Sequence, residues 1–257
     1  RVVSLREDAE GSIWVGANGG LYRLRETLFS SYTERDGLSG DYVRTVFEDR
    51  DRQLWVGSAS GLDLQTADGR FRAMPLHNRG GKAPSVLSLA QGPDGDLWVG
   101  TFGDGVYRLG PDGRLRHNYA AADGMPGGNI RAISVDPQGV VWAGTQKGVV
   151  RIDGDRVQVS SMAGMPGGLI TALEHDHQGN LWIGTIEGIR VLRGDHVQSI
   201  DLAPMGGGRS VFGFHQIGEA MWISSDRGLY RWYRNRLSRV GLEQGMPVDA
   251  VFQLVPD

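Results

Sequence analysis

Short apolar stretches alternate with turn-forming residues along the whole chain. In one representative segment, residues 130–135, 141–145, 149–152 and 156–160 are rich in β-branched side chains, and Asp, Gly, Pro and Gln residues separate them. Strands of this length with tight turns between them are typical of an antiparallel meander. The pattern therefore predicts units of four short strands.

The same pattern returns in register with tryptophan. Six tryptophans recur at spacings of 40 to 44 residues. A glycine stands two residues after five of them, and Ser224 takes that place after the sixth. The predicted repeats are residues 1–37, 38–80, 81–124, 125–164, 165–204, 205–245 and a partial 246–257.

One four-stranded unit cannot bury both of its faces, but copies stacked radially around an axis can. We therefore expect an all-β fold, a single β-propeller domain over residues 1–257 with four-stranded antiparallel blades. The tryptophans should be mostly buried between blades, and the glycine two residues later should allow the next sheet to approach closely.

The repeat register also predicts a seventh unit. Met246 stands where Met125, Met165 and Met205 stand in earlier repeats, so residues 251–255 should form the first strand of a further blade. Six full blades plus one strand suggest an excerpt of a seven-bladed or tandem propeller. The opening Arg-Val-Val-Ser-Leu, without Met, fits the same expectation.

Composition narrows the function classes. The net charge is −3, which does not favour nucleic acid or an anionic membrane. Cysteine is absent, so neither disulfides nor thiol chemistry contribute. The longest apolar runs are far shorter than a membrane span, so we expect no direct membrane insertion by this segment.

Glu174-His175-Asp176-His177 is the best metal-like cluster, because alternate residues of a strand share one face. Asp176, however, occupies the turn position that Asp8, Asp49 and Asp136 hold elsewhere, so we interpret the cluster as a polar turn. No metal site and no cofactor are predicted.

Two further segments have simple structural interpretations. Residues 206–209, Gly-Gly-Gly-Arg, could form an anion-binding nest, but they align with inter-blade loops and no helix or lysine motif follows. Residues 231–239 are basic and aromatic, and we interpret them as a solvated blade edge. The sequence contains no nucleophile elbow or zinc-protease motif.

The fourth repeat carries a recognisable phrase: Asp-Gly-Met-Pro, Ile-Arg-Ala-Ile, Asp-Pro-Gln-Gly-Val-Val-Trp-Ala-Gly-Thr and Gly-Val-Val-Arg-Ile. This resembles the repeat of the two-component regulator propeller family. The resemblance implies a periplasmic sensor domain of an inner-membrane protein, ahead of a β-sandwich, a transmembrane helix and a histidine kinase or diguanylate cyclase output. In that family, seven blades and tandem propellers are usual.

Positions at one end of the predicted blades differ among the repeats, whereas the aspartate turns at the other end repeat closely. Because the repeat does not dictate which residues stand at these positions, they are available for recognition. Arginines there suit an anionic or carbonyl-rich ligand, although they could also solvate a rim or contact a neighbouring domain. The predicted ligand-binding residues are Tyr42, Arg44, Phe102, Asp104, Asn129, Arg131, Lys147, Glu187, Arg209 and Arg227.

The leading hypothesis is an extracytoplasmic ligand-binding domain, not itself an enzyme, of a bacterial transmembrane signalling protein. The partner would be a small molecule, an oligosaccharide or a neighbouring domain, and homodimerisation through the full-length protein is compatible with it. Alternatives are a propeller enzyme of the streptogramin-lyase or glycosidase kind, and a structural platform for protein interaction. Fold alone does not choose among them.

Overall fold

The computed structural model describes residues 2–9, 11–25, 28–202, 210–241, 244–246 and 250–251. Within them the chain is all-β and has the predicted β-propeller fold, with six blades of four antiparallel strands in sequence order. Two short 3-10 helices, η1 (Glu34–Asp36) and η2 (Ala121–Asp123), interrupt the strands. No helix among these residues is long and apolar enough to cross a membrane.

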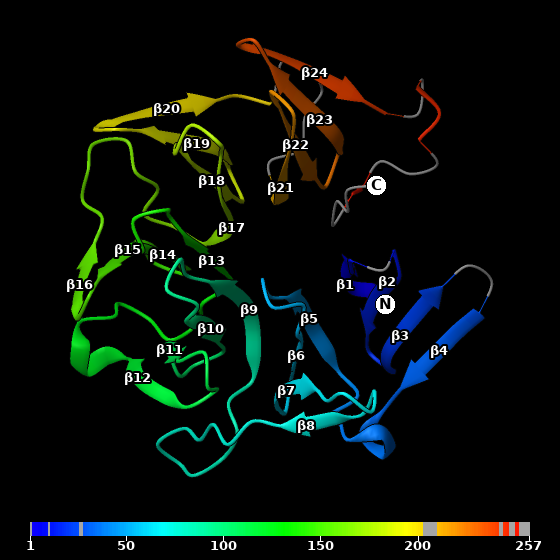
Figure 1. Ribbon diagram of the computed structural model, residues 1–257. Coiled ribbons are helices and arrows are strands. Elements are labelled where there is room, and N and C mark those ends of the chain that lie inside the picture. Colours follow the sequence, from blue (N-terminus) through cyan, green and yellow to red (C-terminus); the bar gives the residue numbers. More distant parts are fainter. Residues whose placement is uncertain are drawn as a thin grey trace. The chain divides into compact units, whose positions relative to one another are not determined.

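The chain divides into two compact units of three blades each, residues 1–130 and 131–256, which are described separately (Figure 1). The blades of the first unit are β1–β4 (Val2–Glu7, Ile13–Ala17, Gly20–Arg25, Leu28–Tyr32), β5–β8 (Val43–Glu48, Leu54–Ser58, Gly61–Gln65, Phe71–Ala73) and β9–β12 (Val86–Gln91, Leu97–Thr101, Val106–Leu109, Leu115–Tyr119). Those of the second are β13–β16 (Ala132–Val135, Val141–Thr145, Gly148–Asp153, Arg156–Val159), β17–β20 (Ile170–His175, Leu181–Thr185, Gly188–Arg193, His196–Ile200) and β21–β24 (Val211–Ile217, Ala220–Ser225, Gly228–Tyr233, Arg236–Val240).

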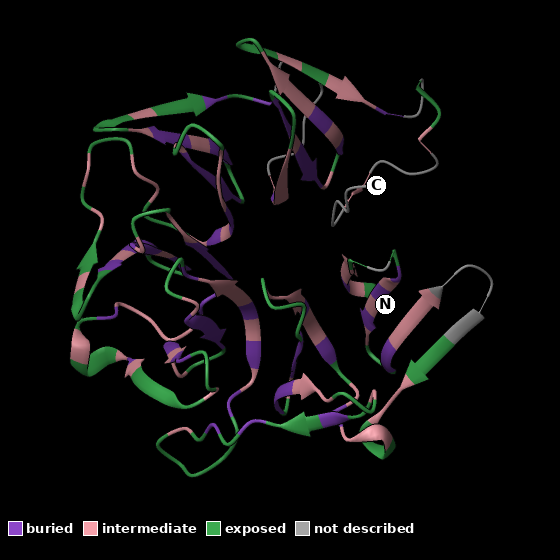
Figure 2. Ribbon diagram, viewed as in Figure 1, coloured by how far each residue is buried: buried purple, intermediate pink, exposed green. Residues whose placement is uncertain are grey.

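Burial follows the order of strands within each blade. The second strands of blades 2, 3 and 5 (β6, β10 and β18) are buried throughout, whereas the fourth strands β12, β16 and β20 are largely exposed (Figure 2). Within each unit the first strands of successive blades lie side by side: β1 contacts β5 and β5 contacts β9, while β13 contacts β17 and β17 contacts β21. The apolar core is thus concentrated toward the first three strands of the blades.

The glycine two residues after each tryptophan does what the sequence predicts. A Cβ on Gly57 would lie 2.5 Å from a methyl carbon of Val86, and one on Gly144 would lie 2.6 Å from Cγ2 of Ile170. Val86 and Ile170 both belong to the next blade, so the absent side chain is what lets that blade approach.

The sixth blade has a serine in place of this glycine, and a glycine on the neighbouring strand makes room for it. Ser224 takes the glycine position, and its partner on the neighbouring strand is Gly213. In blade 4 the corresponding pair is Ala132 on the first strand and Gly144 on the second. Both blades thus pair a glycine with a small residue, but in blade 6 the glycine is on the first strand. Ser224 is fully buried, and its hydroxyl donates to the Gly213 carbonyl at 3.3 Å.

Four of the six repeat tryptophans are buried: Trp14, Trp55, Trp98 and Trp182. This confirms that they are mostly core residues. Trp142 and Trp222 are only half-buried and are the two exceptions. Trp142 still packs against the cluster that contains Leu173 and Leu181 of the next blade.

Of the strand predicted to begin a seventh blade, residues 251–255, only Val251 is described. The amide of Val251 donates to the carbonyl of Ser225 at 2.9 Å, as Ile130 donates to Thr101 at 2.8 Å at the equivalent inter-blade position. Val251 therefore occupies the register expected for the start of a first strand. The remainder of the predicted strand lies outside the described residues.

Candidate functional site

The turns of each blade lie at two ends. We call one the aspartate end, because it holds the turns that begin at Asp8, Asp49, Asp136 and Asp176. The other is the hydroxyl end, where Ser58, Thr145, Thr185 and Ser225 begin the turns between second and third strands.

At the aspartate end the carboxylates have a structural role, as the sequence suggested. Asp8 accepts a hydrogen bond from the Ser12 amide at 2.7 Å and another from the Trp14 indole at 2.7 Å. Asp49 and Asp176 bind their own tryptophans in the same way. One carboxylate thus fixes both the hairpin turn and the orientation of a core indole.

At the hydroxyl end the turn backbone is fixed while the side chains at its tip stay free to vary. The hydroxyl of Thr185 accepts from the Glu187 amide at 2.9 Å and donates to the Gly188 carbonyl at 3.0 Å. Thr145 makes the same pair of bonds around Lys147. The structure therefore explains why the repeat does not dictate the tip residues.

Four of the predicted recognition residues lie at this end in the second unit, and all four are exposed: Arg131, Lys147, Glu187 and Arg227. Arg209 lies outside the described residues. A cavity of about 400 Å³ opens nearby, lined by Gly164–Leu169, Thr185–Glu187, Arg190 and Ser199. Of the predicted residues, the cavity includes Glu187.

Five predicted residues belong to the first unit. Tyr42 and Phe102 are exposed aromatic side chains, 38% and 51% accessible. The Arg44 guanidinium lies 4.9 Å from the centre of the Tyr42 ring, so the structure brings this pair together. Asp104, which accepts a hydrogen bond from Asn78 at 3.5 Å, and Asn129 are half-buried.

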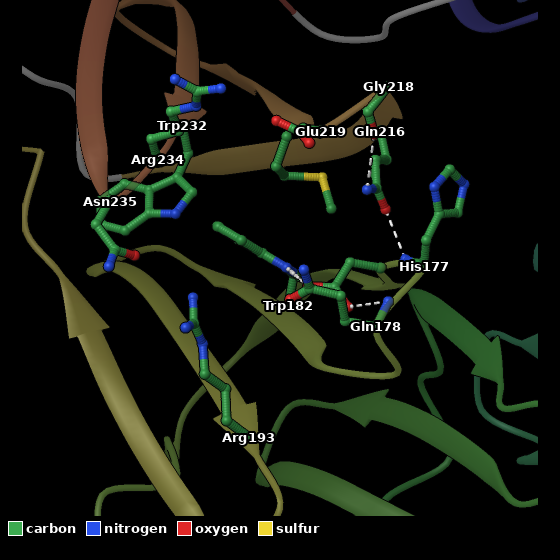
Figure 3. A pocket seen from close by; sticks show the side chains of 12 residues that line it. His177, Gln178, Trp182, Arg193, Gln216, Gly218, Glu219, Trp232, Arg234 and Asn235 are labelled. Carbon is green, nitrogen blue, oxygen red and sulfur yellow. Dashed lines mark hydrogen bonds between the residues drawn. The ribbon is translucent and has the colours of Figure 1, made fainter.

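A second cavity of about 400 Å³ lies at the aspartate end of the second unit, between blades 5 and 6 (Figure 3). We call it the blade 5–6 cleft. Its lining residues are Asp176, His177, Gln178, Trp182, Arg193, Gln216, Gly218, Glu219, Met221, Trp232, Arg234 and Asn235.

Tight hairpins position the rim of this cleft. Arg234 and Asn235 join β23 to β24 with φ angles of 48° and 58°, the left-handed pair that a two-residue hairpin loop requires. Gly218, with φ of 59°, turns β21 into β22 and places Glu219 on the rim. These two turns bring the polar side chains of Glu219, Arg234 and Asn235 to one opening.

The floor of the cleft is aromatic. The rings of Trp182 and Trp232 meet edge to face, with centroids 6.2 Å apart, and Met221 lies beside them. On the opposite side, Gln216 accepts from the His177 amide at 2.7 Å and donates to the Gly218 carbonyl at 3.0 Å.

The cleft also contains an ionised carboxylate. Burial raises the pKa of Asp176, but hydrogen bonds from Asn180 and Trp182 outweigh that effect and hold the pKa below its usual range. Since the other charged lining residues are Glu219, Arg193 and Arg234, both signs of charge meet above an aromatic floor.

Sequence reasoning missed this cleft because the aspartate turns repeat so closely. Two departures could have revealed it. Val191 stands where four other repeats have arginine, and Trp232 stands where the second repeat has Gln65. Both lie on third strands, away from the turns on which the sequence comparison concentrated.

The histidine cluster suggested by the sequence is not assembled as a metal site. Among the described residues, no group of three His, Cys, Asp or Glu side chains could hold a metal ion. The Nδ1 atom of His175 instead pairs with the Ser134 hydroxyl at 2.7 Å, and burial lowers the pKa of this imidazole.

Comparison with known proteins finds one repeat family in four segments of the chain. The model of the two-component regulator propeller matches residues 37–60, 80–103, 124–147 and 164–187. A histidine kinase P4 of Formosa agariphila is 27% identical over 166 residues, which are 58% of this chain and 12% of that protein. The chain thus spans a small part of the curated relative that it matches.

Solved structures agree on the fold. The extracellular domain of a hybrid two component system from B. thetaiotaomicron superposes with a TM-score of 0.82 at 21% identity, covering 95% of this chain and 37% of that one. A second such domain, from the same organism, gives 0.80 at 18% identity, with 97% and 36% covered. A virginiamycin B lyase from Staphylococcus aureus gives 0.78 at 14%, with 95% and 85% covered.

The family matches fall one in each of blades 2 to 5, and each runs from just before the first strand into the turn that follows the Gly-Thr or Gly-Ser of the second. The tryptophan and glycine that organise the blade core lie inside every match. Four segments of the chain therefore match the repeat of the two-component regulator propeller family.

Proposed function

We propose that this chain is the ligand-sensing propeller of a bacterial transmembrane signalling protein, and that it works outside the cytoplasm, in the periplasm. The observation that carries the proposal is the hydroxyl end, where a fixed turn backbone presents exposed side chains that differ from blade to blade. The structural resemblance to extracellular domains of two component systems supports the same role.

On this proposal the exposed residues of the hydroxyl end contact a ligand or a neighbouring domain. Arg44 and Arg131, one in each unit, are the charged groups to test first, since guanidinium groups bind carboxylates and carbonyls with defined geometry. In the full-length protein, Arg44→Ala with Arg131→Ala should weaken the signalling response and leave the fold intact.

A matched control is Arg72→Ala with Arg156→Ala, which removes one exposed arginine from a fourth strand in each unit. The control should signal normally. If the Arg44 and Arg131 pair signals as the control does, the hydroxyl end is not the working surface.

The enzyme alternative has its own test. The lyase structure that this fold resembles was determined with quinupristin. Conversion of quinupristin by this chain would contradict a purely sensory role. On the sensory proposal we expect no conversion.

A further inference from the structure

The repeat normally places an arginine beside its tryptophan. In four of the six blades the residue paired with tryptophan across the ladder is an arginine: Arg23, Arg108, Arg151 and Arg231. The guanidinium carbon lies over the indole at 5.0 Å in the first blade and at 5.1 Å in the third. A guanidinium over an indole at this distance is a cation–π contact.

In the first and third blades this arginine also meets a carboxylate of the aspartate end, and in the first it is the aspartate that holds the indole. Arg23 forms a salt bridge with Asp8 at 3.4 Å, and Arg108 forms one with Asp94 at 2.9 Å. Blades 1 and 3 therefore each hold a guanidinium between an indole face and a carboxylate.

Blade 5 keeps the site and lacks its arginine. Val191 is the ladder partner of Trp182, while Asp176 still accepts the indole hydrogen bond at 3.0 Å. Asn180 supplies a further hydrogen bond to the Asp176 carboxylate at 2.8 Å, but an amide carries no charge. No salt bridge to Asp176 is found within the described part of the chain.

Loss of the arginine coincides with an open cavity. The equivalent space between blades 1 and 2, where Arg23 is present, measures about 50 Å³, against about 400 Å³ in the blade 5–6 cleft. Blade 2 also lacks the arginine, and Leu64 there packs against the cluster of Tyr107 and Leu97, as the fully buried Val191 packs against Trp182 in blade 5. In blade 5 a short, buried side chain at the arginine position therefore coincides with a cavity of ligand size that is lined by Asp176 and Trp182.

The rest of the lining fits a ligand of mixed charge. Glu219 adds a second carboxylate at the rim, and Arg193 reaches into the opening from the other side (Figure 3). Arg193 would favour a carboxylate at the end of the ligand opposite to its cation. Trp232 provides an indole surface in addition to that of Trp182.

We propose that the blade 5–6 cleft binds a free amino acid with a guanidinium side chain, whose guanidinium takes the place that other blades fill with their own arginine. The cation lies beside Trp182 and Trp232, between the carboxylates of Asp176 and Glu219. The α-carboxylate pairs with Arg193. This site is at the opposite end of the blades from the recognition residues proposed above and does not depend on them.

The first test uses two isosteric probes on the purified chain. L-arginine and L-citrulline have nearly the same shape, but citrulline carries a neutral urea in place of the guanidinium. Titration calorimetry should show L-arginine binding with one site, and L-citrulline binding about tenfold more weakly or less, since charge-assisted hydrogen bonds are roughly twice as strong as neutral ones. Equal binding of the two compounds, or no binding of L-arginine, would overturn the proposal.

The second test restores the repeat. Val191→Arg supplies the missing side chain at its usual register and should abolish L-arginine binding by occupying the site. Leu64→Arg makes the same change at the same register in blade 2 and should leave binding unchanged. Normal binding by Val191→Arg, once its fold is verified, would overturn the proposal.

Two milder variants decide the matter if Val191→Arg does not fold. Trp232→Gln introduces the residue that blade 2 has at this position, and Glu219→Gln removes one exposed carboxylate. Each should weaken L-arginine binding by about tenfold, and Glu219→Gln should leave the weak citrulline affinity almost unchanged. If both variants bind L-arginine as the unmodified chain does, the cleft is not the site.

Discussion

Substituting Gly144 by alanine tests the packing logic of the whole propeller. The new Cβ would lie 2.6 Å from Cγ2 of Ile170 and 2.9 Å from its Cβ, whereas carbon atoms in favourable contact are about 3.5–4.0 Å apart. Ile170 is fully buried at the start of β17 and cannot turn aside into solvent. Something in the interface between blades 4 and 5 must therefore shift.

The size of the effect follows from two opposing contributions. Overpacking a closed core costs about 1–3 kcal/mol. Replacing glycine in a strand regains about 0.5–1 kcal/mol of backbone entropy. We therefore expect Gly144→Ala to lower the free energy of unfolding by about 1–2 kcal/mol.

Urea unfolding followed by tryptophan fluorescence measures this change. Gly167→Ala is the control, because a Cβ there meets no atom within 4 Å and the residue does not need a left-handed backbone. It should change the free energy of unfolding by less than about 0.5 kcal/mol.

A double variant separates steric conflict from other causes. Ile170→Ala alone should cost about 2–5 kcal/mol as a cavity-forming change. Combined with Gly144→Ala, it removes the Cγ2 contact, so the pair should cost at least about 1 kcal/mol less than the sum of the two. Strict additivity, or a Gly144→Ala variant as stable as the control, would refute the close-approach argument.

Three further predictions concern single side chains. Trp182→Ala should lower the free energy of unfolding by about 3–5 kcal/mol and the half-buried Trp142→Ala by clearly less, as compared by urea unfolding; equal losses would contradict the observed difference in burial. Because burial lowers the pKa of His175 from its usual 6.5, protonation favours the unfolded chain, so stability should fall as the pH drops from about 7 toward 5. His175→Gln should flatten that part of a melting-temperature profile against pH, and an unchanged slope would exclude His175 as its source. Thr185→Val, which deletes two turn hydrogen bonds, should cost about 1–2 kcal/mol in the same urea assay, and a change below about 0.5 kcal/mol would mean that the hydroxyl does not hold the turn.

The fold could be predicted from the sequence because its strongest signals are one-dimensional. Each tryptophan marks a second strand, and the glycine two residues later marks where the next blade packs. For the fourth repeat the predicted strands agree with β13–β16 to within two residues. Spacing along the chain is sufficient for such features, since every blade repeats them.

The missed features depend on pairs of residues whose contact is visible only in space. The sequence shows Ser224 in place of glycine, but the reason that it fits, Gly213 on the neighbouring strand, requires the ladder register. The blade 5–6 cleft likewise depends on the small Val191 of one blade and the large Trp232 of the next. Neither residue alone departs from what a strand permits.

The reversed pair in blade 6 also constrains how such blades can diverge. In most blades a small residue on the first strand faces a glycine on the second, as in blade 4. Two substitutions are needed to reach the opposite arrangement of blade 6. One intermediate has two glycines, which loses a small side chain; the other has two side chains, and a Cβ on Gly213 would already lie 3.2 Å from the Ser224 hydroxyl oxygen. The path through two glycines avoids this close contact but adds backbone freedom, so on either path the order is exchanged through a less stable intermediate.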